Sequence, residues 1–241
     1  FFICLEVNPL EEVFRQEKKF LISLEEFYKC SGQLDPILLQ DPNNGLHGYR
    51  IRSLYFDTPE EKDFFEKEEG VETRRKIRLR LYDPAASYAV LEMKQKQGMY
   101  QKKRSLRVSR ETARRLAAGD YAPLLQEHSS FAAECYGLMN CAGYRPRAVV
   151  EYRRKAYIAK ENKIRVTFDR NMIATESNFD LFSPNLPMYP VWDPYLVVME
   201  VKYNGFLLSY IRELINRYGR SELSVSKYCL SRSVSLHYLY Q

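Results

Sequence analysis

The sequence contains no apolar run approaching the roughly 20 residues that a helix needs to span a membrane, so no such helix is expected. Histidine is scarce, and the three copies, His47, His128 and His237, lie far apart in the chain. Histidine chemistry requires positioned partner groups, so we interpret these three residues as surface or structural residues.

Cysteine is also rare. The five cysteines are an odd number and form no C-x-x-C pair, which argues against both a disulfide framework and a zinc site. Free thiols are typical of a reducing compartment, and the sequence therefore predicts a cytoplasmic location.

The glycine-rich phosphate-binding motifs are missing as well. The chain has no G-x-x-x-x-G-K-[ST], no G-x-G-x-x-G and no G-x-S-x-G, so any binding of phosphate must use other groups than a P-loop. The net charge of +6 is moderate, and the lysines and arginines gather in strand-like segments rather than in a tail. This distribution predicts a localised anion site and argues against a nucleic-acid partner.

The clearest pattern that is present is a strand-like alternation of basic and apolar residues from Arg74 to Tyr82. Successive residues of a strand point to opposite faces, which separates the basic from the apolar side chains. One face carries Arg74, Lys76, Arg78 and Arg80, and the other carries Ile77, Leu79 and Leu81. Because like charges along a strand repel one another, we expect an anion to compensate the basic face.

The same alternation recurs in four further segments. Their charged faces carry Arg15, Glu17 and Lys19 near the start, then Glu92, Lys94 and Lys96, then Lys163, Arg165 and Asp169, and finally Glu200 and Lys202. An antiparallel sheet with one solvated face is the alternative interpretation, and it predicts serine, threonine, glutamine and mixed charge on that face. The prevalence of arginine and lysine favours an enclosed charged face instead.

The chain is predicted to be rich in strands. Strand-like segments are 14–22, 49–57, 72–82, 88–95, 101–108, 148–159, 163–169 and 195–203. Helices are expected to start at Ser23, Thr58 and Ser109, and to cover 123–141, 206–218 and 226–240. The segment 177–194 is expected to be an ordered loop, because it carries several large apolar residues.

These elements predict an α+β fold in a single domain over residues 1–241, with a core of about 14–239. Helices that cover outward-facing apolar strand faces would leave the charged faces inside. The simplest such architecture is a closed antiparallel β-barrel of roughly eight strands with a charged lumen and helices packed outside.

Several short motifs follow one another in a fixed order. They are Arg15-x-Glu17-x-Lys19-Phe20, Ser53-Leu-Tyr-Phe-Asp57, Ile77-Arg78-Leu-Arg80-Leu-Tyr82, Leu91-Glu-Met-Lys94, Tyr152-Arg-Arg154, Arg165-Val-Thr-Phe-Asp169, Met199-Glu200-Val-Lys202 and Ser226-Lys227-Tyr228. Together they resemble the triphosphate tunnel metalloenzymes, a CYTH-like superfamily. Within it, the chain resembles the bacterial form of the polyphosphate polymerase domain of the vacuolar transporter chaperone (VTC) family.

The resemblance implies a role for many of the charged residues. The tunnel residues that grip a nucleotide triphosphate and a phosphate chain match Lys19, Arg78, Arg80, Lys94, Arg154, Arg165 and Lys227, and also Lys103 on the following strand. Tyr152 and Ser226 match neutral phosphate contacts, and Glu200 matches the carboxylate that holds Mn²⁺ or Mg²⁺. We add Glu92 and Glu17 as candidate metal helpers, and Arg15, Lys76, Lys96 and Lys202 as substrate-binding candidates from the charged faces.

One position departs from the hydrolytic members of this superfamily. Many of them open with Glu-x-Glu-x-Lys, whereas here the first position is Arg15. The change removes one potential metal ligand and resembles the polymerase branch more than thiamine triphosphatase or class IV adenylate cyclase.

The resemblance therefore implies transfer of the γ-phosphate of ATP to the end of a polyphosphate chain. The expected partners are ATP or another triphosphate and polyphosphate, with a membrane protein that accepts the chain as a further candidate. A metal-dependent triphosphatase and a non-catalytic polyphosphate- or nucleotide-binding module stay open as alternatives. For the carboxylates, the alternative to metal binding is a structural ion pair with a tunnel arginine or lysine.

Overall fold

The computed structural model describes residues 15–98, 100–219, 222–224 and 226–232. The strands are β1 (Arg15–Ser23), β2 (Leu39–Gln40), β3 (Tyr49–Asp57), β4 (Arg74–Leu81), β5 (Tyr88–Gln97), β6 (Tyr100–Ser109), β7 (Arg145–Ile158), β8 (Arg165–Thr175), β9 (Tyr189–Pro190) and β10 (Leu196–Asn204). The helices are α1 (Leu24–Leu34), α2 (Lys62–Glu68), α3 (Arg110–Ala117), α4 (Ser130–Cys141) and α5 (Ser209–Tyr218), with 3-10 helices η1 (Ala122–Gln126) and η2 (Glu161–Lys163). Residues 227–232 are also helical, and we call them the C-terminal helix.

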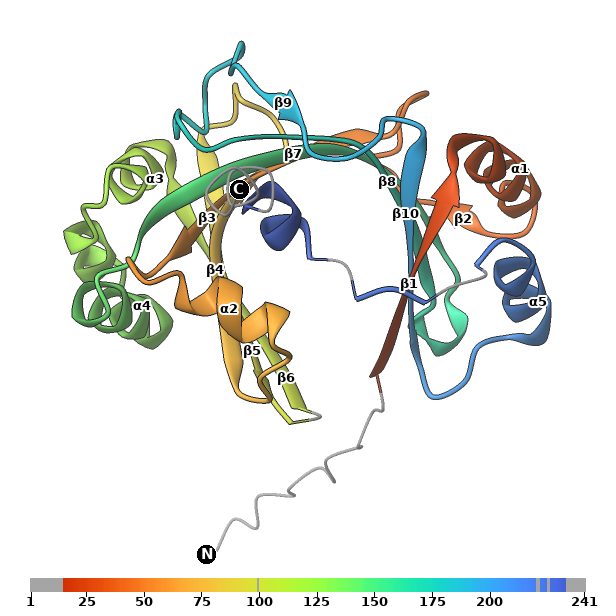
Figure 1. The fold of residues 1–241 in the computed structure, drawn as a ribbon, viewed down its shortest axis with the longest axis horizontal. Coiled ribbons are helices and arrows are strands. Elements are labelled where there is room, and N and C mark those ends of the chain that lie inside the picture. Colours follow the sequence, from red (N-terminus) through yellow and green to blue (C-terminus); the bar gives the residue numbers. More distant parts are fainter. Residues whose placement is uncertain (1–14, 99, 220–221, 225, 233–241) are drawn as a thin grey trace, which may run out of the picture.

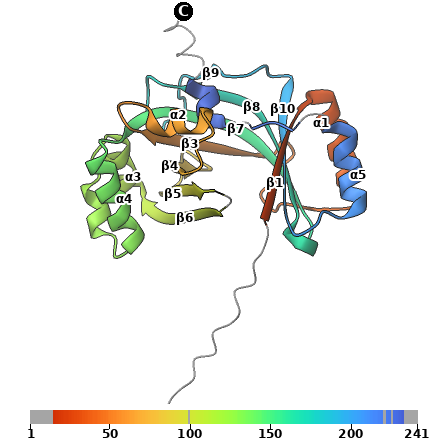
Figure 2. The same ribbon diagram turned by 60° about the horizontal axis from the view of Figure 1, so that its bottom comes forward.

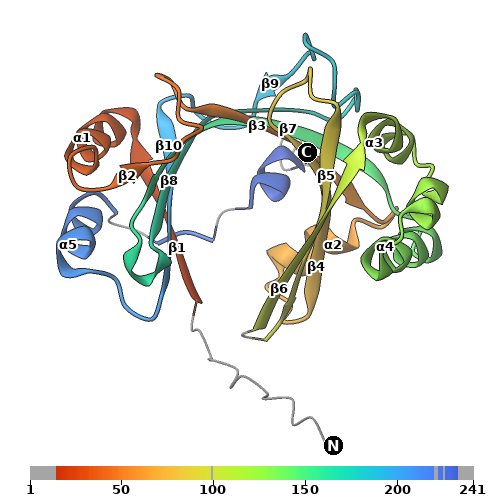
Figure 3. The ribbon, with the colours of Figure 1, turned by 180° about the vertical axis from the view of Figure 1, so that it is seen from behind.

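One antiparallel sheet forms the centre of the fold and curves into an arch (Figure 1). Its strand order is β1-β10-β8-β7-β3-β4-β5-β6, with the short strands β2 and β9 attached to β7 and β8. The α+β class and the eight long strands are thus confirmed. The closed barrel is wrong, because the sheet order ends at β1 on one arm of the arch and at β6 on the other (Figures 2 and 3).

The open sheet has a physical explanation at the outer edge of β1. Phe20 pairs with Glu222 in an antiparallel bridge, and the backbone N–H of Leu223 donates to the carbonyl of Lys19 at 2.8 Å. The chain leading to the C-terminal helix therefore occupies part of the edge that β6 would need to close the barrel. The other edge, β6, is strongly charged and largely exposed, as is typical of a sheet edge that does not pair.

The convex face of the arch is covered by helices on both arms, as expected for outward-facing apolar strand faces. One core contains Leu54, Ile77, Leu79 and Leu91 with α3 and α4, and the other contains Phe20, Phe168 and Met199 with α1 and α5. Figure 1 shows these helix pairs outside the two arms. Each arm therefore has its own apolar core between the sheet and its helices. Burial of this apolar area is the main contribution to the stability of the fold.

The concave face of the arch is partly charged and partly apolar. A third core lies on this side and joins Ile51, Tyr55 and Tyr152 of the sheet to Phe64 of α2 and Tyr228 of the C-terminal helix. Figure 1 shows the C-terminal helix inside the arch. The interior is therefore not a purely polar lumen, and the chain fills part of it with its own C-terminal segment.

Several helix boundaries follow the expected capping signals. Ser23 caps α1 in a reciprocal capping box with Glu26, and Ser109 caps α3 by accepting from the N–H of Thr112. Thr58, by contrast, begins a turn, and α2 starts only at Lys62 after Glu61, which adopts a left-handed conformation with φ 57°.

Other boundaries differ from expectation. The continuous helix over 123–141 is wrong, because Glu127 and Ser129 take extended backbone angles that separate η1 from α4. The helix over 206–218 begins at Ser209. The strand expected from Lys163 begins at Arg165, because left-handed angles at Asn162 and Lys163 keep Lys163 out of the charged face.

The expectation that 177–194 is ordered is confirmed. Leu181 and Phe182 are buried in the core beneath α3 and α4, and Trp192 packs against the concave core. The helix expected over 226–240 is present as far as residue 232, and its remainder, like Cys4, lies outside the described residues. In the part of the chain that the structure describes, no helix could cross a membrane, and Cys30, Cys135, Cys141 and Cys229 are free thiols.

Candidate functional site

The first cluster of the concave face lies on β3 to β6 and centres on Glu92. Arg78 Nε donates to Glu92 Oε2 at 2.7 Å, and Arg78 Nη1 donates to the hydroxyl of Tyr55 at 3.1 Å. Arg80 Nη2 lies 3.3 Å from Glu92 Oε2, and Lys103 Nζ lies 2.5 Å from Glu92 Oε1. Strand alternation and the register of Tyr55 opposite Arg78 place these groups on one face. Glu92 thus orients three basic residues at once.

The second cluster lies on β7, β8 and the C-terminal helix and centres on Asp169, which is fully buried. Arg154 donates to both carboxylate oxygens of Asp169, at 2.6 and 2.7 Å, in a bidentate pair. Lys227 Nζ lies 2.7 Å from Asp169 Oδ2 and 4.8 Å from the ring centroid of Tyr152. Burial alone raises the pKa of Asp169, but Arg154 and Lys227 outweigh this effect and lower it.

The third cluster lies on β1 and β10, where the register sets Lys19 opposite Glu200 and Glu17 opposite Lys202. Glu200 forms a close ion pair with Lys202, and Glu17 Oε1 lies 3.1 Å from Lys19 Nζ. Lys94 of β5 reaches this cluster, with its Nζ 3.6 Å from Glu17 Oε2. On these two adjacent strands a lysine stands opposite a glutamate in both pairs, and this attraction allows the charged side chains to lie close together.

A fourth group connects the first two clusters. Lys76 Nζ donates to the hydroxyl of Ser226 at 2.7 Å and lies 5.7 and 5.9 Å from the ring centroids of Tyr55 and Tyr228. Burial lowers the pKa of Lys76 to about 8, because an ammonium group loses hydration there. Lys76 and Ser226 are thus neighbours although 150 residues separate them.

The remaining sequence-predicted residues, Arg165, Lys96 and Arg15, belong to β8, β5 and β1. Arg165 Nη2 donates to Asp41 Oδ2 at 2.6 Å and to the hydroxyl of Tyr49 at 3.1 Å. Lys96 stands opposite Arg74 in the β4–β5 pair. Arg15 stands opposite Asn204 in the backbone register.

Gly48 allows the loop that carries Asp41 to lie close against the backbone of Arg154 in β7. Gly48 has φ 73°, and a Cβ there would lie 2.4 Å from the carbonyl oxygen of Arg154. Only glycine fits such a close contact in a left-handed conformation. This position therefore fixes Tyr49 and Arg154 side by side in the register of β3 and β7.

Among the strand residues whose buried polar atoms have no hydrogen-bond partner in the described part of the chain, three stand beside the clusters described above. They are Arg80 Nε, Ser53 Oγ and Thr167 Oγ1. Ser53 stands opposite Arg80, and Thr167 stands opposite Glu200. Because buried polar groups are normally paired, these atoms indicate capacity for a further partner on the concave face.

The charge balance of this face is positive. Its basic side chains are Lys19, Lys76, Arg78, Arg80, Lys94, Lys103, Arg154, Arg165, Lys202 and Lys227, and its carboxylates are Glu17, Asp41, Glu92, Asp169 and Glu200. Such an excess of arginine and lysine on one concave face suits a multiply charged anion.

Glu17 and Glu200 are the two carboxylates of the third cluster, and they are the residues that could hold a divalent cation. Burial raises the pKa of Glu200, but Lys202, Lys227 and Lys19 lower it by more, so the group is ionised. Burial and the charge of Glu200 both raise the pKa of Glu17, and Lys202 and Lys19 again reverse the direction. Both carboxylates contact the same ammonium group, because Lys202 pairs with Glu200 and its Nζ also lies 3.7 Å from Glu17 Oε2.

Their chemistry fits Mg²⁺ or Mn²⁺, which take hard oxygen ligands and complete their coordination with water and substrate phosphates. Within the described ranges, no group of three or more His, Cys, Asp or Glu side chains could form a cage made of protein ligands alone. Glu92 forms ion pairs with Arg78, Arg80 and Lys103. These contacts favour a role in orienting the three basic side chains over a role as a metal ligand.

Sequence analysis gave no site role to Asp169, Tyr55 or Asp41. Strand alternation placed Asp169 on a charged face without a site role, and Tyr55 lies within a quoted motif, where its alternation with Leu54 and Phe56 would have placed it on the same kind of face. The pairing of Asp41 with Arg165 had no sequence signal, because it depends on how the loop before β3 folds back.

The fold of this protein is similar to those of several solved structures. An adenylate cyclase candidate from Bacillus halodurans has a TM-score of 0.51 and 13% identity, and the likeness covers 88% of this chain and 95% of that one. A Hippeastrum adenylyl cyclase candidate, described as having a dominant triphosphatase activity, has a TM-score of 0.54 and 16% identity, with 91% and 96% covered. At these identities the likenesses show a shared fold.

A match to a protein-family model shows the family of this chain. The VTC domain model matches residues 14–236, and the chain therefore belongs to the VTC domain family. No protein with a curated description matches the chain.

Proposed function

We propose that this protein is a metal-dependent phosphotransferase that binds the triphosphate of ATP on the concave face of the arch and extends a polyphosphate chain. The observation that carries the proposal is the excess of basic side chains on the concave face, contributed by many strands and the C-terminal helix. Membership of the VTC domain family supports it.

The basic clusters would align and neutralise the phosphates. Arginine forks bind phosphate oxygens in pairs, and lysine adds a compact charge. Arg78 and Arg80 are held by Glu92, and Arg154 is held by Asp169, so their guanidinium groups are oriented before substrate arrives. Phosphoryl transfer depends on such alignment and charge stabilisation more than on covalent chemistry by the protein.

Glu200 and Glu17 would hold a divalent cation against the phosphates. The cation, when bound, supplies charge that stabilises the transferring group. Lys19 and Lys202, which flank both carboxylates, keep them ionised. The terminal oxygen of the phosphate chain would form a bond to the γ-phosphorus while the bond to the β–γ bridging oxygen breaks, and ADP would leave. An ionised phosphate already carries the attacking electron pair, so a general base is not required.

A triphosphatase is the second candidate. The Hippeastrum protein of the same fold is described as having a dominant triphosphatase activity. Two ionised carboxylates on β1 and β10 could orient a water in place of a phosphate chain end. Arg15 at the first position of the β1 motif favours polymerisation, because it replaces a carboxylate with a cation.

The test is incubation of pure protein with ATP and Mn²⁺, and separately Mg²⁺, while long-chain phosphate, ADP and free phosphate are followed together. Long chains that disappear with Glu200→Gln support the polymerase. The matched control is Glu25→Gln, because Glu25 pairs with Lys29 on the exposed side of α1. Free phosphate without chains would establish the triphosphatase, and binding without either product would leave a binding module.

A further inference from the structure

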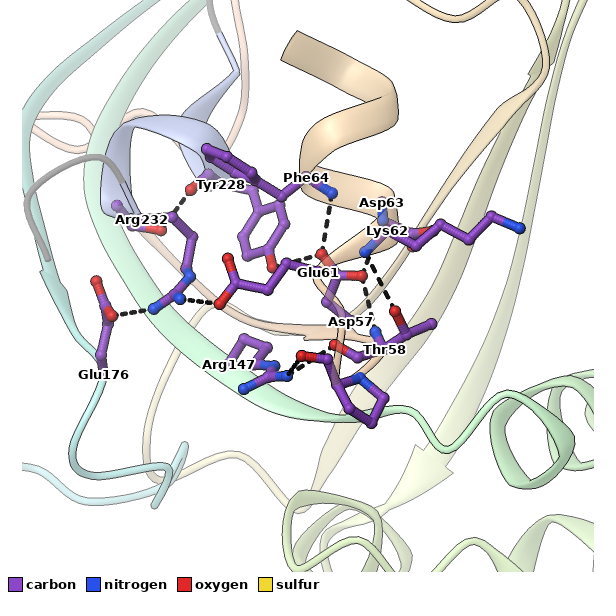
Figure 4. Close-up of polar contacts among 12 residues, drawn as sticks. Asp57, Thr58, Glu61, Lys62, Asp63, Phe64, Arg147, Glu176, Tyr228 and Arg232 are labelled. Atoms are coloured by element: carbon purple, nitrogen blue, oxygen red, sulfur yellow. Dashed lines mark hydrogen bonds and ion pairs between the residues drawn. The ribbon is translucent and has the colours of Figure 1, made fainter. Parts of the chain in front are cut away.

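The C-terminal segment 226–232 contacts the arch at two separate places. At its start, Ser226 and Lys227 contact the candidate site through Lys76 and Asp169. Farther along, Tyr228 and Arg232 contact the turn between β3 and α2 (Figure 4). One short helix therefore connects the phosphate-binding face to a second polar cluster that the proposed chemistry does not use.

The first part of this cluster is a buried acceptor at the end of β3. Asp57 accepts hydrogen bonds from the N–H groups of Thr58, Asp63 and Phe64, at 2.7, 2.9 and 2.9 Å. The hydroxyl of Tyr228 donates to Asp57 Oδ2 at 2.7 Å, as Figure 4 shows. Asp57 thus fixes the turn and the C-terminal helix with the same carboxylate.

The second part is a guanidinium held by two carboxylates. Arg232 forms close ion pairs with Glu61 in the turn before α2 and with Glu176 after β8. Its side chain is 10% exposed. A buried charge pair of this kind is costly to break, since one partner then stays desolvated and unpaired.

The turn that receives the helix is braced from the sheet. Arg147 of β7 donates to the carbonyls of Thr58 and Pro59 at 2.7 and 2.8 Å. Glu61, although not a glycine, adopts φ 57° and ψ 38°, and in this conformation its side chain reaches Arg232. A left-handed glutamate persists only where surrounding contacts determine it, so the turn is built to present Glu61.

We propose that Asp57, Glu61 and Glu176 form a clamp that holds Tyr228 and Arg232, and thereby positions Lys227 and Ser226 for binding of a triphosphate. This inference rests on the proposed function, because it assumes that the concave face binds phosphates. The clamp residues are positioning residues, since they act through the helix and not on substrate. Tyr228 follows Lys227 directly, and its ring lies 5.3 Å from that of Tyr55, so displacement of the helix displaces the ammonium group.

The test measures binding of inorganic tripolyphosphate to the full chain by calorimetry. Arg232→Gln is expected to weaken binding about tenfold, comparable to loss of one charge-assisted contact. Arg232→Lys is expected to restore most of the affinity. Tyr228→Phe, which removes only the hydroxyl, is expected to change affinity in the same direction and guards against an unfolded Arg232→Gln protein.

A double-mutant cycle separates positioning from general stability. If the clamp acts through Lys227, Arg232→Gln added to Lys227→Ala changes affinity by less than about twofold, because the positioned group is already absent. Independent, multiplicative losses would overturn the proposal, as would wild-type affinity in both Arg232→Gln and Tyr228→Phe.

A second readout needs no ligand. Lys227 is 11% exposed on its side chain, so trypsin is expected to cleave after it slowly in the wild-type chain and at least several-fold faster in Arg232→Gln. Equal cleavage rates would overturn the clamp. A wild-type chain that does not bind tripolyphosphate would overturn the proposed function and the role of the clamp in affinity, whereas the cleavage rates would still report whether the helix is held.

Discussion

Lys94 Nζ of β5 lies 3.6 Å from Glu17 Oε2 of β1, and this contact joins the two arms of an arch whose sheet order runs open from β1 to β6. The nearby charges of Glu17, Lys19, Lys202 and Glu200 all act on the ammonium group of Lys94. Side chains thus connect the two arms, although β1 and β6 at the ends of the sheet do not pair with each other.

A first prediction concerns Lys94. Its pair with Glu17 is partly exposed, so Lys94→Gln should lower the free energy of unfolding by less than about 1 kcal/mol. The same change should weaken tripolyphosphate binding about tenfold, because one cation facing the site is lost. Urea unfolding and calorimetry measure the two effects. Lys29→Gln on α1 is the control, and equal affinity of both variants would contradict the prediction.

A second prediction concerns Asp169, whose carboxylate neutralises Arg154 and Lys227. Asp169→Asn leaves two buried cations without their carboxylate and should destabilise the fold by about 3–5 kcal/mol. Denaturant unfolding measures this change. Asp120→Asn, which breaks an exposed pair with Arg115, should leave the unfolding midpoint nearly unchanged. Similar midpoints for the two variants would show that the Asp169 cluster does not support the fold.

A third prediction concerns pH. Burial lowers the pKa of Lys76 to about 8, so its positive charge is present below that pH and lost above it. Triphosphate affinity should therefore fall as the pH rises from 7 to 9, and binding near pH 8 should take up protons. The unfolded lysine keeps its proton up to its ordinary pKa of 10.5, so the contribution of Lys76 to the free energy of unfolding rises with pH from about 8 to about 10.5.

Calorimetry in buffers of different ionisation enthalpy measures this proton uptake. Lys76→Arg keeps its charge throughout the range and should remove part of the decline in affinity. A decline of unchanged size in Lys76→Arg would assign the pH dependence to another group.

A fourth prediction separates metal binding from orientation of arginines. Glu92 contacts Arg78, Arg80 and Lys103, so Glu92→Gln should raise the KM for ATP about tenfold through loss of charge-assisted contacts. The Mn²⁺ concentration for half-maximal activity should stay the same. Steady-state kinetics at several metal concentrations measures both quantities. A marked rise in the metal requirement would instead place Glu92 among the metal ligands.

A fifth prediction applies the same measurement to Glu17. If Glu17 and Glu200 share the cation, Glu17→Gln should raise the Mn²⁺ concentration needed for half-maximal activity. The fold should tolerate the change, because Glu17 is partly exposed and its pairs with Lys19 and Lys94 are shared. An unaltered metal requirement would leave Glu17 as an ion-pair partner only.

Much of the site was readable from local pattern. Strand alternation alone assigned Lys76, Arg78 and Arg80 to one face of β4, and the structure places all three on the concave side. Alternation works here because the period of a strand is fixed by backbone geometry, and one buried face strongly specifies the register. The capping box at Ser23 is equally local and is present as expected.

Other features depended on contacts between distant segments. The helix expected from 123 to 141 breaks before Ser130, where Glu127 and Ser129 take extended backbone angles. The helix expected from Thr58 begins only at Lys62, because hydrogen bonds with Asp57 and Arg147 organise the turn before it. The pairing of the C-terminal chain with Phe20, which replaces barrel closure along part of β1, has no local sequence signal.

The sequence by itself determined the strands, their charged and apolar faces, and the family to which the chain belongs, because these depend on local periodicity and on ordered motifs. Only the tertiary structure decided that the sheet stays open, that Tyr228 and Arg232 contact Asp57 and Glu61, and that Glu92 and Glu17 differ in their neighbours. These outcomes depend on which distant groups meet and lose water together, and the free energy of such contacts is set by the folded surroundings rather than by neighbours along the chain.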